Sequence, residues 1–236
     1  MPTQPPVTTA TCTAFCLIVA VVAAIWPVLT WRALGPRAAR IATLVVAVWL
    51  AVCWWLGVER TLLPVDGRMP PPFAKVIVPT TLAVLTLGLS PLGRRLATGV
   101  PLAWLLLIQS FRLPLELVMA QLAAEGALPP QMTLHGWNFD ILSGVLGLLL
   151  GLWALRRPLP SWLVAAYNAM GLGLLVTVVS IAVRSAPGPL AAWPDLPRNT
   201  LVFYEPYTTL PLVLVMSALL GHVLLARALR AERVPS

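Results

Sequence analysis

Charged residues are scarce in this chain of 236 residues. Only 10% are Asp, Glu, Lys or Arg, whereas roughly a quarter of the residues of a soluble domain are charged. Hydrophobic residues make up 59%, and the mean hydropathy is +0.87. This composition excludes an ordinary soluble protein and leaves no stretch for a separate soluble domain. We therefore expect a single transmembrane domain over residues 1–236.

Cysteine and histidine are also few, with three and two residues. Cys12, Cys16 and Cys53 form no Cys-x-x-Cys pair, and His135 and His222 are far apart in sequence. The pattern therefore predicts no zinc or haem site, no disulfide and no cofactor. The thiols fall in or next to apolar segments, where we expect them to pack as small hydrophobic side chains.

Long apolar runs are what the sequence does contain. About 20 apolar residues cross the ~30 Å hydrocarbon core of a bilayer as a helix. The expected fold is all-α, a polytopic membrane protein with seven transmembrane helices. The predicted spans are about 11–31, 41–58, 73–90, 96–122, 138–155, 162–183 and 207–229.

Basic residues are unevenly distributed over the ends of these spans. One set of ends carries ten arginines and one acid, whereas the other carries six basic and seven acidic residues. Since the excess of Lys and Arg stays on the cytoplasmic side, we predict an outside N-terminus and a cytoplasmic C-terminus in a bacterial inner (plasma) membrane. No basic residue precedes the first span, unlike in a signal peptide, so we expect that span to be retained. The net charge of +8 thus indicates orientation, and no nucleic-acid partner is expected.

Three ionisable residues are predicted to lie inside the outer part of the bundle. A helix rises about 1.5 Å per residue. Counted from the arginines at the predicted cytoplasmic ends, Arg112 and Glu116 therefore lie in the outer part of the fourth span, and Asp140 lies in the outer part of the fifth. Arg112 and Glu116 are four residues apart, with Pro114 between them, so they share a face beside a predicted kink. Such charges mark a functional site by default, although an ion pair that only fixes helix packing explains them equally well.

Two outer loops add polar residues. The first, 125–140, contains His135, Asn138 and Asp140, of which the last two also fit as caps of the fifth span. The second, 198–207, contains Asn199, Tyr204 and Glu205, whose aromatic neighbours fit an interfacial anchor equally well. We expect a charged pocket that faces outward. Its predicted ligand-binding residues are Arg112, Glu116, His135, Asn138, Asp140, Asn199, Tyr204 and Glu205.

The inner two thirds of the predicted bundle contain neither a carboxylate nor a lysine. Proton pumps and ion-coupled carriers usually keep an ionisable group near the midplane, so this absence argues against both classes. The last span has no lysine, which excludes the usual retinal attachment of a rhodopsin. Asn168 is the clearest amide of the inner half, and His222 lies five residues before Arg227 at the inner boundary. We expect both to form hydrogen bonds between helices.

Three short motifs lie in the second half of the chain: Phe111-Arg112-Leu113-Pro114-Leu115-Glu116, then Met132-Thr133 with Gly136 and Asn138-Phe139-Asp140-Ile141, then Asn199 with Phe203-Tyr204 and Pro206. They resemble a family of uncharacterised multi-pass bacterial membrane proteins with seven helices and no assigned activity. The resemblance covers roughly residues 105–215. His135 and Trp137 stand where that family has charged residues beside the glycine. The resemblance implies the same outer cluster and supplies no function.

Three classes of function remain. The first is a binding, sensing or accessory protein that holds a small polar or anionic ligand on Arg112. The second is a small-solute transporter or channel, for which the thin polar path would be Gln109, Ser110, Thr177, Ser180 and Asn168. The third, a membrane enzyme with Glu116 or Asp140 as general base, lacks a nucleophile motif, so we assign no catalytic residue. The expected partners are the lipid bilayer and a second copy or another membrane subunit.

Overall fold

The structure is a computed structural model and describes residues 4–64, 70–193 and 195–232, which fold into helices and connecting turns. Helices α1 (Thr9–Leu34) and α2 (Pro36–Val58) form an antiparallel pair. Gly35 joins them with a φ of 86°, which glycine adopts without strain, and Pro36 starts α2. Helices α3 (Ala74–Leu89) and α4 (Pro91–Gly99) follow and meet at an angle of 64°.

The second part of the chain builds the helices around the predicted site. Helix α5 (Leu102–Leu107), the 3₁₀ turn η1 (Ile108–Phe111) and α6 (Arg112–Ala124) run on as one helical segment. Helices α7 (Ile141–Ala154) and α8 (Ser161–Ser185) come next. A π-helical turn, η4 (Leu210–Val215), leads into α9 (Met216–Glu232). Two further 3₁₀ turns, η2 (Pro130–Met132) and η3 (Leu201–Phe203), lie in the loops.

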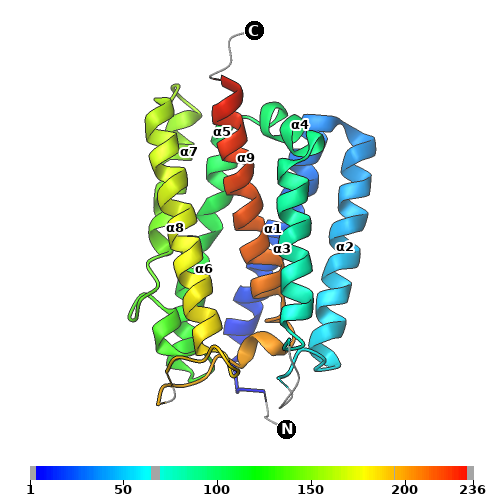
Figure 1. Ribbon diagram of the computed structural model, residues 1–236. Helices are drawn as coiled ribbons and strands as arrows, with labels where there is room; N and C mark the ends of the chain where they lie inside the picture. Colours follow the sequence, from blue (N-terminus) through cyan, green and yellow to red (C-terminus); the bar gives the residue numbers. More distant parts are fainter. Residues whose placement is uncertain (1–3, 65–69, 194, 233–236) are drawn as a thin grey trace.

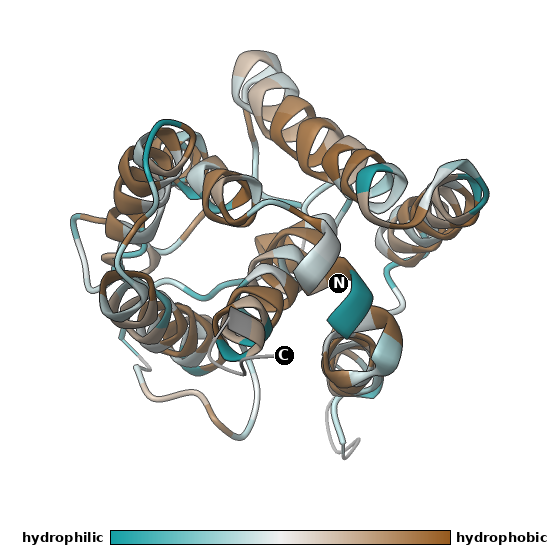
Figure 2. Ribbon diagram, turned by 90° about the horizontal axis from the view of Figure 1, so that it is seen from above, coloured by the Kyte–Doolittle hydropathy of each residue, from teal (hydrophilic) through white to brown (hydrophobic). Residues whose placement is uncertain are grey.

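Five helical segments among the described residues are long and apolar enough to cross a membrane, and the bent pair α3 and α4 makes a sixth. Figure 2 shows the hydrophobic residues along these helices, and side chains such as Leu17, Leu44 and Leu82 are more than half exposed, as a lipid-facing surface requires. The protein is therefore a multi-pass helical membrane protein.

The predicted count of seven spans is supported only in part. The span predicted over 138–155 is helical only as α7, whose 14 residues reach about 21 Å and fall short of the ~30 Å core. The span predicted over 96–122 begins at Leu102, because Val100 and Pro101 are extended and end α4. Near Pro114 the helical segment changes to 3₁₀ geometry at η1, before the proline, and Pro114 itself stands in the first turn of α6, where proline is tolerated.

Helix α9 lies in the middle of the bundle, where it packs against α3, α4, α5 and α8. Figure 1 shows that α1 begins and α9 ends at opposite ends of the bundle. The arginine-rich ends of α1 and α9, together with α4, lie at the same end. The sequence-based prediction that this end faces the cytoplasm remains a prediction.

Small residues on α7 allow close packing. A Cβ atom on Gly147 would lie 2.7 Å from the hydroxyl of Tyr167 and 3.0 Å from the carbonyl of Leu106. A Cβ on Gly151 would lie 2.6 Å from Leu107. Helix α7 is therefore held tightly between α5 and α8, and this contact positions the polar residues described next.

Candidate functional site: a buried polar cluster

Arg112 and Asp140 form an ion pair in the interior of the bundle. Nη1 of Arg112 donates to Oδ1 of Asp140 at 2.9 Å, and the two residues are only 1% and 7% exposed. Asp140 stands directly before α7, at the position of an N-cap, but its side chain makes no capping hydrogen bond. The carboxylate of Asp140 therefore pairs with Arg112 and does not cap the first turn of α7.

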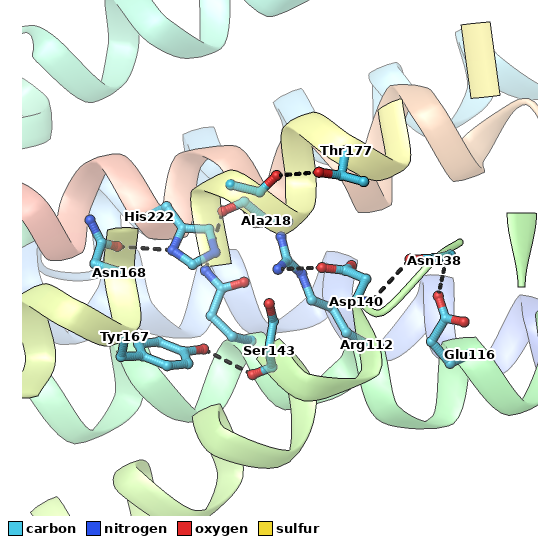
Figure 3. Close-up of polar contacts among 12 residues, drawn as sticks. Arg112, Glu116, Asn138, Asp140, Ser143, Tyr167, Asn168, Thr177, Ala218 and His222 are labelled. Carbon is cyan, nitrogen blue, oxygen red and sulfur yellow. Dashed lines mark hydrogen bonds and ion pairs between the residues drawn. The ribbon is translucent and has the colours of Figure 1, made fainter. Parts of the chain in front are cut away.

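Asn138 connects this ion pair to Glu116. Its Nδ2 atom donates to Oε1 of Glu116 and to the carbonyl of Met132, and its Oδ1 atom accepts from the N–H of Asp140 at 3.0 Å. Figure 3 shows Asn138 between the two carboxylates. We call Arg112, Glu116, Asn138 and Asp140 the outer cluster. These four predicted residues therefore come together, and all four are buried.

The loop before α7 is held in a fixed shape that presents Asn138 and Asp140. The Thr133 hydroxyl donates to the carbonyl of Pro130 at 2.9 Å, and Nδ2 of Asn138 closes the turn on Met132. Gln131 donates to the Ser185 hydroxyl at 3.3 Å and so ties the loop to the end of α8. Gly136 is required here, because a Cβ atom would lie 2.5 Å from the Cα of Gln131.

Three buried polar atoms of the outer cluster have no hydrogen-bond partner among the described residues. They are Nε and Nη2 of Arg112 and Oε2 of Glu116. Nε and Nη2 form the side edge of the planar guanidinium, whose two parallel N–H groups match a carboxylate or phosphate in a bidentate pair. Since a buried polar group without a partner is costly, this edge and the second oxygen of Glu116 are the unsatisfied groups of the outer cluster.

The other four predicted site residues lie elsewhere. His135 is exposed in the loop before α7. The N–H of Asn199 donates to the carbonyl of Ser185 at 2.8 Å, at the end of α8. Tyr204 lies beneath the guanidinium of Arg60, and the carbonyl of Glu205 accepts from the Gln4 side chain at 3.0 Å. Within the part of the chain that the structure describes, no hydrogen bond or ion pair joins His135, Asn199 or Glu205 to the outer cluster. Ligand binding by any of the eight residues remains a prediction.

A second set of buried polar residues continues from the outer cluster into the bundle. We call Gln109, Ser143, Tyr167, Asn168 and His222 the inner row. Gln109 lies one turn before Arg112 on the same helical segment and donates to the carbonyl of Ala218 at 3.2 Å. The Tyr167 hydroxyl donates to the carbonyl of Ser143 at 3.0 Å. Figure 3 shows the contact between Tyr167 and Ser143.

The inner row ends at a pair between α8 and α9. Nδ1 of His222 donates to Oδ1 of Asn168 at 2.8 Å, which confirms the predicted hydrogen bond between helices. Tyr167 is not among the residues that the sequence predicts for the site. The sequence could have indicated Tyr167, because it stands directly beside Asn168 in an apolar helix. A tyrosine hydroxyl and an asparagine amide both need hydrogen-bond partners when they are buried in a bundle.

Unpartnered atoms also occur along the inner row. Oε1 of Gln109 and Nε2 of His222 are buried without a hydrogen-bond partner among the described residues. Two glycines leave room for these side chains: a Cβ on Gly221 would lie 2.4 Å from Nε2 of Gln109, and one on Gly171 would lie 2.4 Å from the ring of His222. Polar groups therefore extend from the outer cluster to the inner half of the bundle.

Metal-ligand chemistry does not describe this site. Within residues 4–64, 70–193 and 195–232, no three His, Cys, Asp or Glu side chains are grouped as a metal site would need. The outer cluster combines one cation with two carboxylates and one amide, and the carboxylate of Asp140 is paired with the guanidinium of Arg112.

Comparison with known proteins gives no relative: no protein-family model, no curated protein and no solved structure matches this chain. Of the family resemblance in the sequence, the structure supports the multi-helix membrane architecture alone.

Proposed function

We propose that this protein binds a small polar or anionic molecule at the outer cluster and acts as a binding, sensing or accessory protein of the bacterial inner membrane. The observation that carries the proposal is the side edge of Arg112, whose Nε and Nη2 atoms are buried without partners. Asp140 already uses Nη1, so the remaining edge suits a carboxylate or a phosphate.

The proposed ligand also carries a hydrogen-bond donor. Oε2 of Glu116 is free to accept, while its other oxygen is held by Asn138. A carboxylate on Arg112 and a hydroxyl or ammonium group toward Glu116 would satisfy both residues. Small hydroxy acids and amino acids have this chemistry, and the predicted outer orientation gives them access from outside the cell.

A thermal-shift screen of the purified full-length protein tests the proposal. The probes are acetate, lactate, glycine and inorganic phosphate, each compared for wild type and Glu116→Gln. A ligand at a hundred times its Kd stabilises the folded state by about 2.7 kcal/mol, so binding is measurable as a rise in Tm. We expect lactate or glycine to stabilise wild type and to lose this effect in Glu116→Gln.

Glu59→Gln is the matched control, because Glu59 is exposed at the end of α2 and far along the chain from the cluster. It should respond to the probes as wild type does. The proposal is wrong if none of the probes shifts the Tm of wild type, or if Glu116→Gln and wild type respond equally to a probe that does.

A small-solute transporter is the second candidate function, and the inner row favours it. Its polar side chains continue from Arg112 to the pair of Asn168 and His222. Uptake of the probe that binds, measured in liposomes, separates the two functions. Transport requires uptake that His222→Leu abolishes, whereas a binding protein shows the Tm shift without uptake.

A further inference from the structure

An apolar groove runs along the outside of the bundle between α1 and the segment α5 and η1. Its volume is about 460 Å³, and its walls are formed by residues of α1 from Val21 to Arg32 and by Trp104, Leu107 and Ile108. Leu29 and Ile108 form a buried floor, whereas Val21 and Val28 are about half exposed on the walls. Since α1 is a membrane-crossing helix, this groove opens toward the acyl chains of the bilayer.

One end of the groove carries a positive charge. The guanidinium of Arg32 lies 5.4 Å from the centre of the Trp104 ring, so the two walls meet there in a cation–π contact. Stacking on a ring face leaves the in-plane N–H groups of an arginine free for other acceptors. No acidic side chain of the described residues forms an ion pair with Arg32. The end of the groove is therefore complementary to an anion.

The length of the groove fits one leaflet of a membrane. Val21 and Arg32 are eleven residues apart, which corresponds to about 16 Å along a helix. This is close to half of the ~30 Å hydrocarbon core. A partner helix would need a surface across the whole membrane, whereas the acyl chain of a lipid occupies one leaflet with its headgroup at the interface. Arg32 and Trp31, in the last turn of α1, lie where an interface is expected.

We infer that this groove is a binding site for one anionic phospholipid, with an acyl chain between α1 and α5 and its phosphate on Arg32. The phosphate accepts from the in-plane N–H groups of the guanidinium, as arginine favours. This site lies on the lipid-facing surface, and it does not depend on the function proposed for the outer cluster. Its position at the arginine-rich end matches the leaflet that carries anionic lipid in the predicted orientation.

Native mass spectrometry of the full-length protein in detergent tests the inference. Phosphatidylglycerol and phosphatidylcholine with identical acyl chains are added, and retained lipid is counted per protein. We expect wild type to retain one phosphatidylglycerol in preference to phosphatidylcholine. Arg32→Gln should weaken this preference about fivefold, in line with the contribution of one basic residue at an anionic surface.

Two further variants complete the test. Arg40→Gln removes an exposed arginine near the same end but outside the groove, and should leave lipid retention unchanged. Ala24→Phe fills the groove and should reduce retention of both lipids. Thermal unfolding in the same detergent verifies that each variant is folded. If Ala24→Phe does not fold, the comparison of wild type with Arg32→Gln decides the result.

Three results would overturn the inference. The first is equal retention of the two lipids by wild type, and the second is an unchanged preference in Arg32→Gln. The third is a dimer that Ala24→Phe dissociates, since this would assign the groove to a second copy of the chain.

Discussion

Glu125, directly after α6, accepts a hydrogen bond from the backbone N–H of Thr8, directly before α1, at 3.0 Å. The same carboxylate accepts from the hydroxyls of Thr8 and Thr11 and from the amide of Gln121. A carboxylate at the start of a helix also interacts favourably with the helix dipole. Glu125 therefore fastens the beginning of α1 to the end of α6, although the two residues are 117 positions apart.

This contact predicts a dependence of stability on pH. The hydrogen bonds from Thr11 and Thr8 lower the pKa of Glu125 from 4.5 to about 2. Because the folded-state pKa is lowered, the contribution of Glu125 is complete above the ordinary value and is lost as the pH falls through about 2. The Tm of Glu125→Gln should lie below that of wild type at neutral pH, and the gap should close near pH 2. A gap of constant size would contradict this assignment.

The ion pair of Arg112 and Asp140 predicts a strongly non-additive pair of substitutions. Removing one partner leaves the other charge buried, which typically costs about 3–5 kcal/mol. Arg112→Leu and Asp140→Leu should each lower stability by this amount. The double variant should lose much less than the sum, because neither member of the pair is left behind as an unpaired buried charge. Denaturant unfolding of the four proteins measures the coupling, and additive losses would show that the pair is not isolated from solvent.

Two glycines of α8 provide a matched comparison around His222. A Cβ atom on Gly171 would lie 2.4 Å from Cε1 of the His222 ring, whereas a Cβ on Gly173 would meet nothing within 4 Å. Gly171→Ala should therefore destabilise the protein by about 1–3 kcal/mol through overpacking. Gly173→Ala should be neutral or stabilise it by up to about 1 kcal/mol, since alanine favours the helix. Equal Tm values for the two variants would contradict the close contact of Gly171 with the His222 ring between α8 and α9.

Asn168 and His222 should be coupled energetically across α8 and α9. Hydrogen bonds between membrane helices contribute on average about 0.6 kcal/mol and at most about 1.7 kcal/mol. A double-mutant cycle with Asn168→Leu and His222→Leu should give a coupling in this range. A coupling near zero would indicate that the two side chains find other partners when separated.

The sequence predicted most of the helices but not the breaks between them. Spans 11–31, 41–58 and 162–183 lie within α1, α2 and α8, because continuous apolar runs bounded by charges specify such helices directly. The start of α7 was placed three residues early, since Asn138 and Asp140 are used for tertiary contacts that the local pattern does not encode. The apolar runs thus predict that a helix is present better than they predict the residues at which it begins and ends.

The candidate site was predictable only where its members are charged or near in sequence. Arg112, Glu116 and Asp140 stood out because charges inside a membrane span are rare. Tyr204 and Glu205 are predicted to lie on the same side of the membrane as the cluster. Lying on the same side does not determine which residues contact one another. These two residues pack instead at the end of α2, where Gly57 leaves space for the backbone of Glu205. Tyr167 was not singled out, because a tyrosine in an apolar helix resembles an ordinary core residue.

The shortness of α7 has a consequence for the lipid around the protein. Leu142, Leu149 and Leu152 are exposed on this helix, and its length of about 21 Å is some 9 Å less than the ordinary hydrocarbon thickness. Such hydrophobic mismatch is relieved when the bilayer thins locally, at a cost that rises with bilayer thickness. The bilayer should therefore thin beside α7 and the outer cluster at its start, and short-chain lipids should favour the native state.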